Sequence, residues 1–245
     1  MVSAADADQF RRAQLGVRKL VERDLDRMWV RVWSQIPSGP TQAPNVRDAF
    51  MRQLPVLVNR YGEMAATLAA DWYDVQRQVA GVSGAFSAEV RSTPFLVERV
   101  EGTVQRTAQA LWSPRPEDML TGMKSASGKY ALESGRETIA WSSYKDPQAR
   151  GWYRVVRAGS CSFCQMLHGR GGVYTRETAF FASHKSCNCA AAPSWDGDAP
   201  EVDVEQYKAS DRVEAMRRFA EVNEGAAREL AAMRGRASAF ASSLG

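Results

Sequence analysis

Four cysteines and one histidine gather in a short stretch of the chain, between Cys161 and Cys189. The first half reads Cys161-Ser-Phe-Cys164, and nineteen residues later the second half reads His184-Lys-Ser-Cys187-Asn-Cys189. These are all the cysteines and one of the two histidines of a 245-residue protein. Thiolate and imidazole are the ligands that zinc prefers, and four of them close a tetrahedral site. The stretch therefore predicts a structural zinc knuckle.

Five candidate ligands compete for four positions in this site. We expect Cys161 and Cys164 to be two of the ligands, because a CxxC turn presents two thiolates from one tight bend. The other two come from His184, Cys187 and Cys189, and the remaining residue is spare or bonds to a ligand. A disulfide is the alternative, but Cys187 and Cys189 are too close in the chain to bridge comfortably, and a disulfide does not require His184.

The same stretch lacks the residues that a catalytic zinc site needs. Such a site keeps one position open for water and has an acid–base partner beside it. Between the two halves the only acid is Glu177, and His168 is expected to be a surface or capping residue. The zinc-deaminase, HExxH and P-loop patterns do not occur in the sequence. We therefore expect no enzymatic activity.

The first 145 residues are predicted to form long helices that end at proline and glycine breaks. Apolar residues recur there at three- and four-residue steps, which is typical of one buried helix face. The expected helices span 5–36, 45–79, 94–112 and 117–144. Asn45 is the expected N-cap of the second helix, and Pro55 would kink that helix or start a new one. The fourth helix is rich in Ser, Gly and Ala, which lets neighbouring backbones approach closely.

The stripe predicted to be buried on the second helix consists of Phe50, Leu54, Leu57, Val58, Tyr61, Met64, Leu68, Trp72 and Val75.

The composition changes at Asp146-Pro147, where a small module begins. The segment 151–157 alternates as a strand does, and 169–175 reads as a tight turn followed by a short strand. No regular pattern follows Cys189 until one or two helices predicted over 204–240. The fold class is therefore mainly α: an elongated N-terminal helical half (1–145), a small α+β zinc-knuckle or zinc-ribbon-like module (146–200) and a C-terminal helical segment (201–245).

Composition and charge narrow the function only a little. Hydrophobic residues make up 44% and charged residues 24%, as in globular proteins, and the formal net charge is +4. The first ten residues lack a signal-peptide pattern, and no apolar run is long enough for a membrane helix, so we expect no membrane association. Basic residues around the knuckle leave a zinc-ribbon DNA-binding protein as an alternative. They are Arg154, Arg157, Arg170, Arg176 and Lys185.

The cysteine-rich stretch resembles the corresponding end of a known phage protein family. Cys-Ser-Phe-Cys-Gln-Met-Leu, Arg-Gly-Gly-Val-Tyr-Thr and Phe-Phe-Ala-Ser-His-Lys-Ser-Cys-Asn-Cys follow one another here. Together they are similar to the signature of the Mu F-like minor head proteins of tailed bacteriophages, in the form found in phages of actinobacteria. The helical first half agrees with that family only in its layout.

This resemblance implies a structural virion protein without enzymatic activity. Such a minor capsid protein associates with the portal and the head interior, and acts in head assembly or in DNA packaging and ejection. The implied partners are the phage portal and major capsid proteins, with packaged double-stranded DNA as a further candidate. The implied location is the virion, at the head interior or portal vertex, and the host cytoplasm during assembly. A zinc-dependent hydrolase is the least supported function, because the sequence offers no general base beside the ligands.

Overall fold

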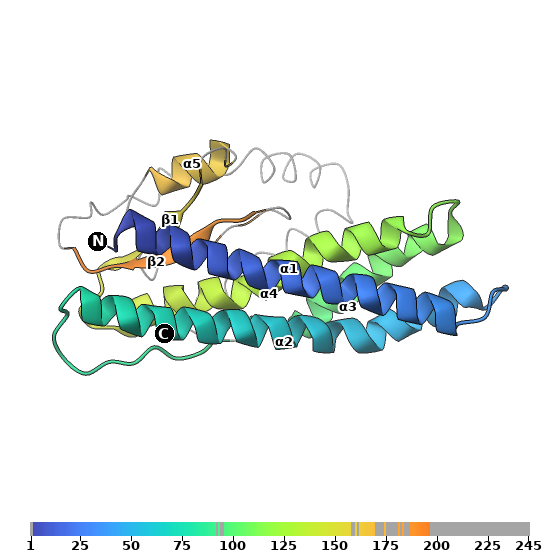
Figure 1. Ribbon diagram of the computed structural model, residues 1–245, viewed down its shortest axis with the longest axis horizontal. Coiled ribbons are helices and arrows are strands. Elements are labelled where there is room, and N and C mark those ends of the chain that lie inside the picture. The colour runs from blue at the N-terminus through green and yellow to red at the C-terminus, as the bar shows by residue number, and fades with distance from the viewer. Residues whose placement is uncertain are drawn as a thin grey trace, which may run out of the picture.

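The fold was analysed in a computed structural model of the chain (Figure 1). The structure describes residues 2–91, 93, 96–157, 160, 162–169, 174, 181, 183 and 187–196. The C-terminal segment 201–245, with its expected helices, lies outside the described residues. Within the described part the protein is mainly helical, as predicted.

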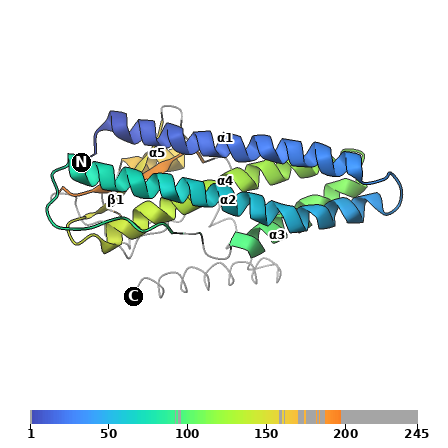
Figure 2. The same ribbon diagram turned by 60° about the horizontal axis from the view of Figure 1, so that its bottom comes forward.

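Four α-helices lie lengthwise beside one another and form an elongated bundle (Figures 1 and 2). They are α1 (Ala4–Gln35), α2 (Gln42–Val79), α3 (Leu96–Thr107) and α4 (Asp118–Lys145), and a 3-10 turn, η1 (Ala108–Trp112), follows α3. At 1.5 Å per residue, α2 is about 57 Å long. Helices α2 and α4 each pack against the other three helices, and α4 also packs against both strands of the β-structure described below. None of the described helices is long and apolar enough to cross a membrane.

The predicted helix positions are confirmed over the described residues, with two local corrections in α2, while the start predicted at 94 lies outside the described residues. Asn45 is not its N-cap, because the helix begins at Gln42, and Thr41 at the cap position makes no side-chain capping bond. Pro55 does not start a new helix, since it lies inside the continuous helix Gln42–Val79. The helix thus tolerates one missing backbone donor in its interior, where Pro55 is buried by its neighbours.

The buried face of α2 follows the predicted stripe only over its first half. Phe50, Leu54 and Val58 are fully buried, whereas Met64 and Val75 are 43% and 53% exposed, so their predicted burial was wrong. Small residues and Tyr73 make the buried face of the second half. They are Ala65, Ala66, Ala69, Ala70 and Tyr73. The sequence pattern missed this face because alanine contributes little to a hydrophobic stripe.

Small residues on α4 permit close helix contacts, as its composition predicted. A side chain at Gly135 would place its Cβ 2.9 Å from the carbonyl oxygen of Ala65 on α2. A Cβ at Gly62 of α2 would lie 3.0 Å from Oγ of Ser134. The α2 and α4 backbones therefore approach each other at a pair of glycines, one on each helix.

A small β-structure packs at the end of the bundle where α1 begins and where α2 and α4 end (Figure 1). Strand β1 (Gly151–Val155) pairs antiparallel with β2 (Ala190–Ser194), and Trp152 also forms a bridge with Tyr174. The short helix α5 (Ser162–His168) lies between the two strands in the sequence. Of the turn and strand predicted over 169–175, the structure describes only Gly169 and Tyr174.

Strand β2 was not predicted, because the segment after Cys189 reads as irregular and contains Pro193. Pro193 lies opposite Trp152 in the register. The backbone N–H and C=O of Trp152 bond instead to Tyr174, at 3.0 and 3.2 Å, on the other side of β1. No donor is therefore required from Pro193, which explains how a proline fits into this strand.

One hydrophobic cluster joins the β-structure to the helices. It contains Phe10 of α1, Tyr73 of α2 and Ile139 of α4 together with Trp152 and Leu167. Phe10 also stacks on Trp72 with ring centroids 4.2 Å apart. The strands and α5 thus share a core with three helices. The predicted division into units 1–145, 146–200 and 201–245 stays a prediction.

Candidate metal centre

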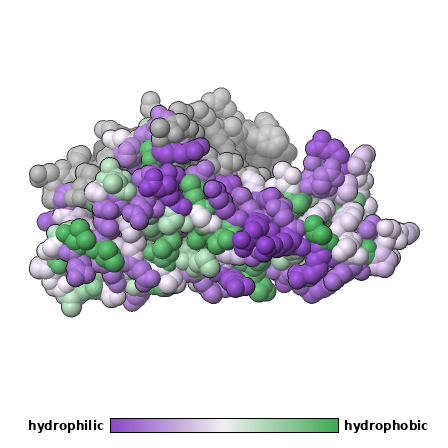
Figure 3. Space-filling model, in the orientation of Figure 1, coloured by the Kyte–Doolittle hydropathy of each residue, from purple (hydrophilic) through white to green (hydrophobic). Residues whose placement is uncertain are grey.

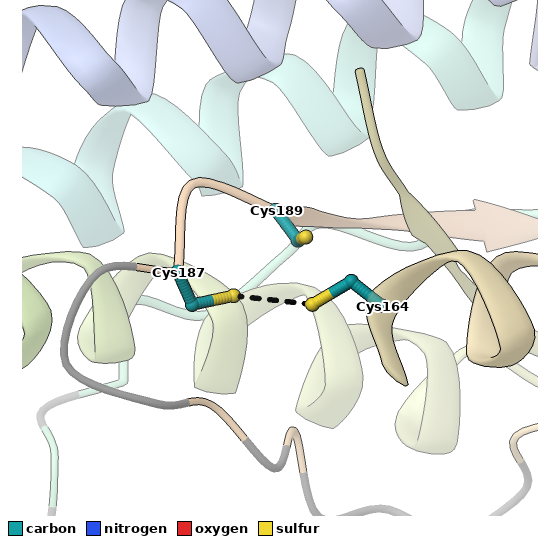
Figure 4. Close-up of side chains that lie close together, drawn as sticks. All are labelled: Cys164, Cys187 and Cys189. Carbon is teal, nitrogen blue, oxygen red and sulfur yellow. Dashed lines mark hydrogen bonds between the residues drawn. The ribbon is translucent and has the colours of Figure 1, made fainter. Parts of the chain in front are cut away.

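Three cysteines from two separate segments meet in the shared core (Figure 4). Cys164 comes from α5, and Cys187 and Cys189 directly precede β2. Their sulfur atoms all lie within 4.8 Å of one another, and the Cys164 and Cys187 sulfurs are 3.8 Å apart. All three side chains are buried, at 1%, 2% and 4% exposure. The predicted joining of the two half-sites is therefore present for these three residues.

The spacing of the sulfurs fits a tetrahedral metal ion. Zinc–sulfur bonds of about 2.3 Å at tetrahedral angles place neighbouring sulfurs about 3.8 Å apart. The distance between Cys164 and Cys187 matches one such edge. Three soft ligands in a closed, buried site are typical of structural zinc rather than of Ca²⁺ or Mg²⁺, which take oxygen ligands. The three cysteines could therefore hold a soft divalent ion.

The sheet and two side-chain contacts place α5 over the end of β1. The hydroxyl of Tyr174 donates to the carbonyl of Leu167 at 3.0 Å. Nδ1 of His168 contacts the carbonyl of Arg154 in β1. His168 is exposed and lies outside the cysteine cluster, as expected for a surface residue. These contacts hold Cys164 on the side of α5 that faces Cys187.

Arg136 of α4 binds the backbone of the Cys187–Cys189 segment. Its Nε and Nη2 donate to the carbonyl of Cys189 at 3.0 and 2.7 Å, and Nη2 also donates to the carbonyl of Cys187 at 3.0 Å. Between the two cysteines, Oδ1 of Asn188 accepts from Nη1 of Arg18 on α1 at 2.8 Å. Two helices of the bundle thus fix the backbone that carries two of the three thiols.

A second arginine, Arg154 of β1, faces the sulfur atoms directly. Its Nη1 lies 3.8 Å from Sγ of Cys164 and 3.9 Å from Sγ of Cys187. The Phe181 ring contacts both guanidinium groups, with its centroid 3.9 Å from Cζ of Arg154 and 4.6 Å from Cζ of Arg136. Phe181 also stacks on Trp152, with 5.5 Å between the ring centroids. Aromatic rings and two buried guanidinium groups therefore pack beside the cysteine cluster.

The pKa values of the clustered thiols are shifted in opposite directions. Hydrogen bonds from Cys164 and Cys189 lower the pKa of Cys187, and Arg136 adds an attractive charge. The hydrogen bond to Cys187 raises the pKa of Cys164, and burial raises it further. The cluster therefore favours one thiolate, at Cys187, held by two thiols. A divalent ion would replace the remaining protons, because metal ligands bind as thiolates.

The five predicted ligands fall into two groups. Cys164, Cys187 and Cys189 come together, whereas Cys161 and His184 lie outside the described residues. The sequence interpretation missed Arg136 and named Arg154 among the basic residues around the knuckle. Arg154 does lie beside the sulfurs, but it is 1% exposed and adds no basic surface. The sequence offered no signal for its burial, because the alternating pattern over 151–157 predicts a half-buried strand, whereas every residue of β1 is buried.

Comparisons with known proteins identify one family. No curated protein and no solved structure matches the chain. The family model described as VG15 protein matches residues 1–227, which include the helical bundle and the whole cysteine-rich stretch. VG15 is a family of viral, phage-associated proteins. Since the match covers most of its length, the chain belongs to the VG15 family.

Proposed function

We propose that this protein is a structural component of a phage virion. Within that role, we propose a minor capsid protein of the Mu F-like type, associated with the portal and the head interior, where it acts in head assembly or in DNA packaging and ejection. It acts there without catalysis. The observation that carries the proposal is the match of residues 1–227 to a viral protein family.

The shape of the helical bundle supports a role in assembly. A long, narrow bundle offers a large side surface for its volume, which suits contacts with other chains (Figure 2). Hydrophobic side chains reach the solvent along α2, and green atoms are interspersed with purple over this face in Figure 3. Those exposed by more than 40% on α2 are Val56, Met64, Val75 and Val79. Exposed hydrophobic residues scattered singly are common on protein surfaces, so the support for assembly comes from the extent of the side surface rather than from these residues.

The cysteine cluster supports a structural metal in this role. A two-stranded sheet and a seven-residue helix bury too little surface to be stable alone. A zinc ion bound by Cys164, Cys187 and Cys189 would hold the two segments together, with the fourth ligand from Cys161 or His184. Its contribution is to folding, because these ligands lie in a closed site among buried side chains.

The test is co-purification with the portal protein encoded by the same phage. We expect the tagged full-length chain to retain the portal protein at physiological salt, and mass spectrometry of purified virions to find the chain in the particle. Cys164→Ser should reduce incorporation into particles. Met166→Ser is the matched control, because Met166 lies on the same helix and is 44% exposed. Virions that lack the chain, or duplex DNA binding with a steep salt dependence and no portal binding, would contradict the proposal.

A further inference from the structure

The exposed charged side chains of α1 are all of one sign. Every exposed charged residue of this helix is basic, whereas its acidic residues are only partly exposed. The exposed ones, which we call the basic stripe, are Arg12, Lys19, Arg23, Arg27 and Arg31. Hydrophilic atoms lie across the middle of the molecule in Figure 3, where α1 crosses it in Figure 1. In α2, α3 and α4, by contrast, the exposed residues include both acids and bases.

The basic stripe runs along the helix because its members recur at nearly whole turns. The first four members fall within about 80° of one another around the helix axis. Arg31 lies nearer to α2, where its Nη2 donates to Oε1 of Gln53 at 2.9 Å. From Arg12 to Arg31 the row is about 28 Å long. Like charges four residues apart destabilise a helix, so the stability of the bundle does not explain the stripe.

Acidic residues beside the stripe neutralise it only in part. Asp24 is shared by Arg23 and Arg27, with 3.3 Å between the paired atoms in each case. These two arginine side chains remain 53% and 69% exposed, so a ligand can reach them. Lys19 and Arg31 form no ion pair with any described residue. Four members of the stripe therefore face a single shared carboxylate.

The other two carboxylates near the stripe are bound by further cations. Asp8 pairs with Arg12 at 2.8 Å, but also with the buried Arg11 at 2.7 Å. Asp26 is held by Lys124 of α4 at 2.8 Å. Neither carboxylate offsets the charge of the stripe by itself. The outer face of α1 thus keeps an excess of positive charge.

The stripe has the chemistry to bind the phosphates of a nucleic acid duplex. Duplex DNA carries one negative charge per about 1.7 Å of its axis, and lysine and arginine neutralise these charges. Proteins bind single strands with exposed aromatic rings, but no aromatic residue of α1 is in the exposed class. A helix binds a membrane surface through its apolar face, and the apolar face of α1 is buried in the bundle.

We propose that the basic stripe of α1 binds the sugar–phosphate backbone of double-stranded DNA without reading its sequence. Phosphate contacts position a protein on the duplex but carry no sequence information. The stripe contains no asparagine or glutamine side chain to bind a base edge. This inference deepens the proposed function, in which packaged DNA is a candidate partner, by naming the surface that contacts it.

The salt dependence of duplex binding is the first test. Fluorescence anisotropy follows the full-length chain binding to a labelled duplex of about 20 base pairs, between about 50 and 200 mM salt. The logarithm of the association constant should fall linearly with the logarithm of the salt concentration. Each cation that contacts a phosphate contributes about −0.9 to the slope, so three to five contacts give roughly −3 to −4.5. Two duplexes of unrelated sequence should bind equally.

Two triple variants that each remove three positive charges separate the stripe from the net charge. The stripe variant is Lys19→Gln, Arg23→Gln and Arg27→Gln. The control takes one exposed cation from each of α2, α3 and α4: Arg60→Gln, Arg106→Gln and Lys145→Gln. The stripe variant should bind at least about 10-fold more weakly at low salt and lower the magnitude of the slope by about 3. The control should change the slope by less than about 1.

A single substitution guards against a folding defect in the triple variant. Lys19 forms no ion pair with any described residue, so Lys19→Gln leaves the packing of α1 unchanged. It should still lower the magnitude of the slope by about 1. An unchanged slope in this variant would remove Lys19 from the contact surface and overturn the stripe as drawn.

Three other outcomes would overturn the inference. They are equal losses in the two triple variants, no duplex binding by the wild type at low salt, and tighter binding to polyglutamate or to anionic phospholipid vesicles than to the duplex. Virions that lack the chain would contradict the virion role. A chain that is present in virions and retains the portal protein, yet binds no duplex, would contradict only the DNA-binding stripe.

Discussion

Arg77 and Asp146 form an ion pair in the protein interior, with 2.9 Å between Nε and Oδ2. Arg77 lies in the last turn of α2, and Asp146 directly follows α4. The same carboxylate accepts from the indole of Trp195 at 3.0 Å and from the hydroxyl of Tyr73 at 3.2 Å. One buried carboxylate thus ties the ends of two helices to the segment that follows β2.

Removal of this carboxylate should destabilise the fold severely. Asp146→Ala leaves the Arg77 guanidinium buried and without its counter-charge, so we expect the free energy of unfolding to fall by about 3 to 5 kcal/mol. Asp118→Ala is the control, because its ion pair with Arg115 is exposed to solvent and should contribute little. Urea unfolding of both variants measures the difference. Similar losses would contradict the structural role of the buried pair.

The hydrogen bonds to Asp146 also make the stability of the fold depend on pH under acidic conditions. Burial acts to raise the pKa of Asp146, but hydrogen bonds from Arg77 and Trp195 outweigh it, and the net pKa is lowered. The folded protein therefore binds this proton less tightly than the unfolded chain. The stabilisation is present above the ordinary carboxyl pKa and is lost as the pH falls through the lower folded value.

Metal removal should loosen the helices as well as the β-structure. Cys164, Cys187 and Cys189 belong to the hydrophobic cluster that includes Phe10, Tyr73 and Ile139. A metal at 1,000 times its dissociation constant stabilises a protein by about 4 kcal/mol, so a chelator should lower the unfolding midpoint by roughly 10 °C. Circular dichroism at 222 nm follows the helices. A midpoint unchanged by the chelator, with metal shown to be released, would uncouple the site from the bundle.

Close contact between α2 and α4 predicts opposite effects at two helical glycines. A Cβ at Gly135 would lie 2.8 Å from the Gln14 amide and 2.9 Å from the Ala65 carbonyl, whereas a Cβ at Gly16 meets nothing within 4 Å. Gly135→Ala should therefore cost about 1 to 3 kcal/mol through overpacking. Gly16→Ala should stabilise α1 by up to about 1 kcal/mol through helix propensity. Thermal unfolding compares them, and a stabilising Gly135→Ala would show that the two helices can separate without cost.

The long helices were predictable because their signals are local. In the helix predicted over 94–112, the apolar residues that recur at three- and four-residue steps are Leu96, Val100, Val104, Ala108 and Leu111, and all five are buried. The prediction fails at Met64 and Val75, which are exposed. In the second half of α2 the buried face contains alanines, which contribute little to a hydrophobic pattern in the sequence. Tertiary contacts with α4 decide that face.

The meeting of Cys164, Cys187 and Cys189 could be predicted from the sequence, but their surroundings could not. Cys164, Cys187 and Cys189 are rare residues whose spacing carries a chemical meaning. Arg136 lies on a helix whose sequence gives no sign that its guanidinium binds carbonyls 51 and 53 residues away. Strand β2 escaped prediction for a similar reason, since Pro193 is tolerated only because Trp152 bonds to Tyr174.

The raised pKa of Glu137 on α4 predicts that the free energy of unfolding declines towards neutral pH. Burial and the charge of Glu133, one turn earlier, raise the pKa of Glu137 to about 7, against the opposing charges of Arg99 and Arg91. The folded protein therefore holds this proton more tightly than the unfolded chain, and the free energy of unfolding falls as the pH rises from about 4.5 to about 7. Glu137→Gln should remove this slope and raise stability at pH 8 by about 1 to 3 kcal/mol.

Unfolding by urea at pH 5 and pH 8 measures this effect, with Glu63→Gln on the exposed face of α2 as the control. Glu137→Gln should differ from the wild type chiefly at pH 8, because at pH 5 the wild-type carboxyl is largely protonated in the folded state. The same pH dependence in the wild type and in Glu137→Gln would place the titrating group elsewhere. Thr138, the next residue, accepts from the backbone N–H of Arg91 at 3.0 Å, so amide exchange at Arg91 also reports whether ionised Glu137 loosens the segment before α3.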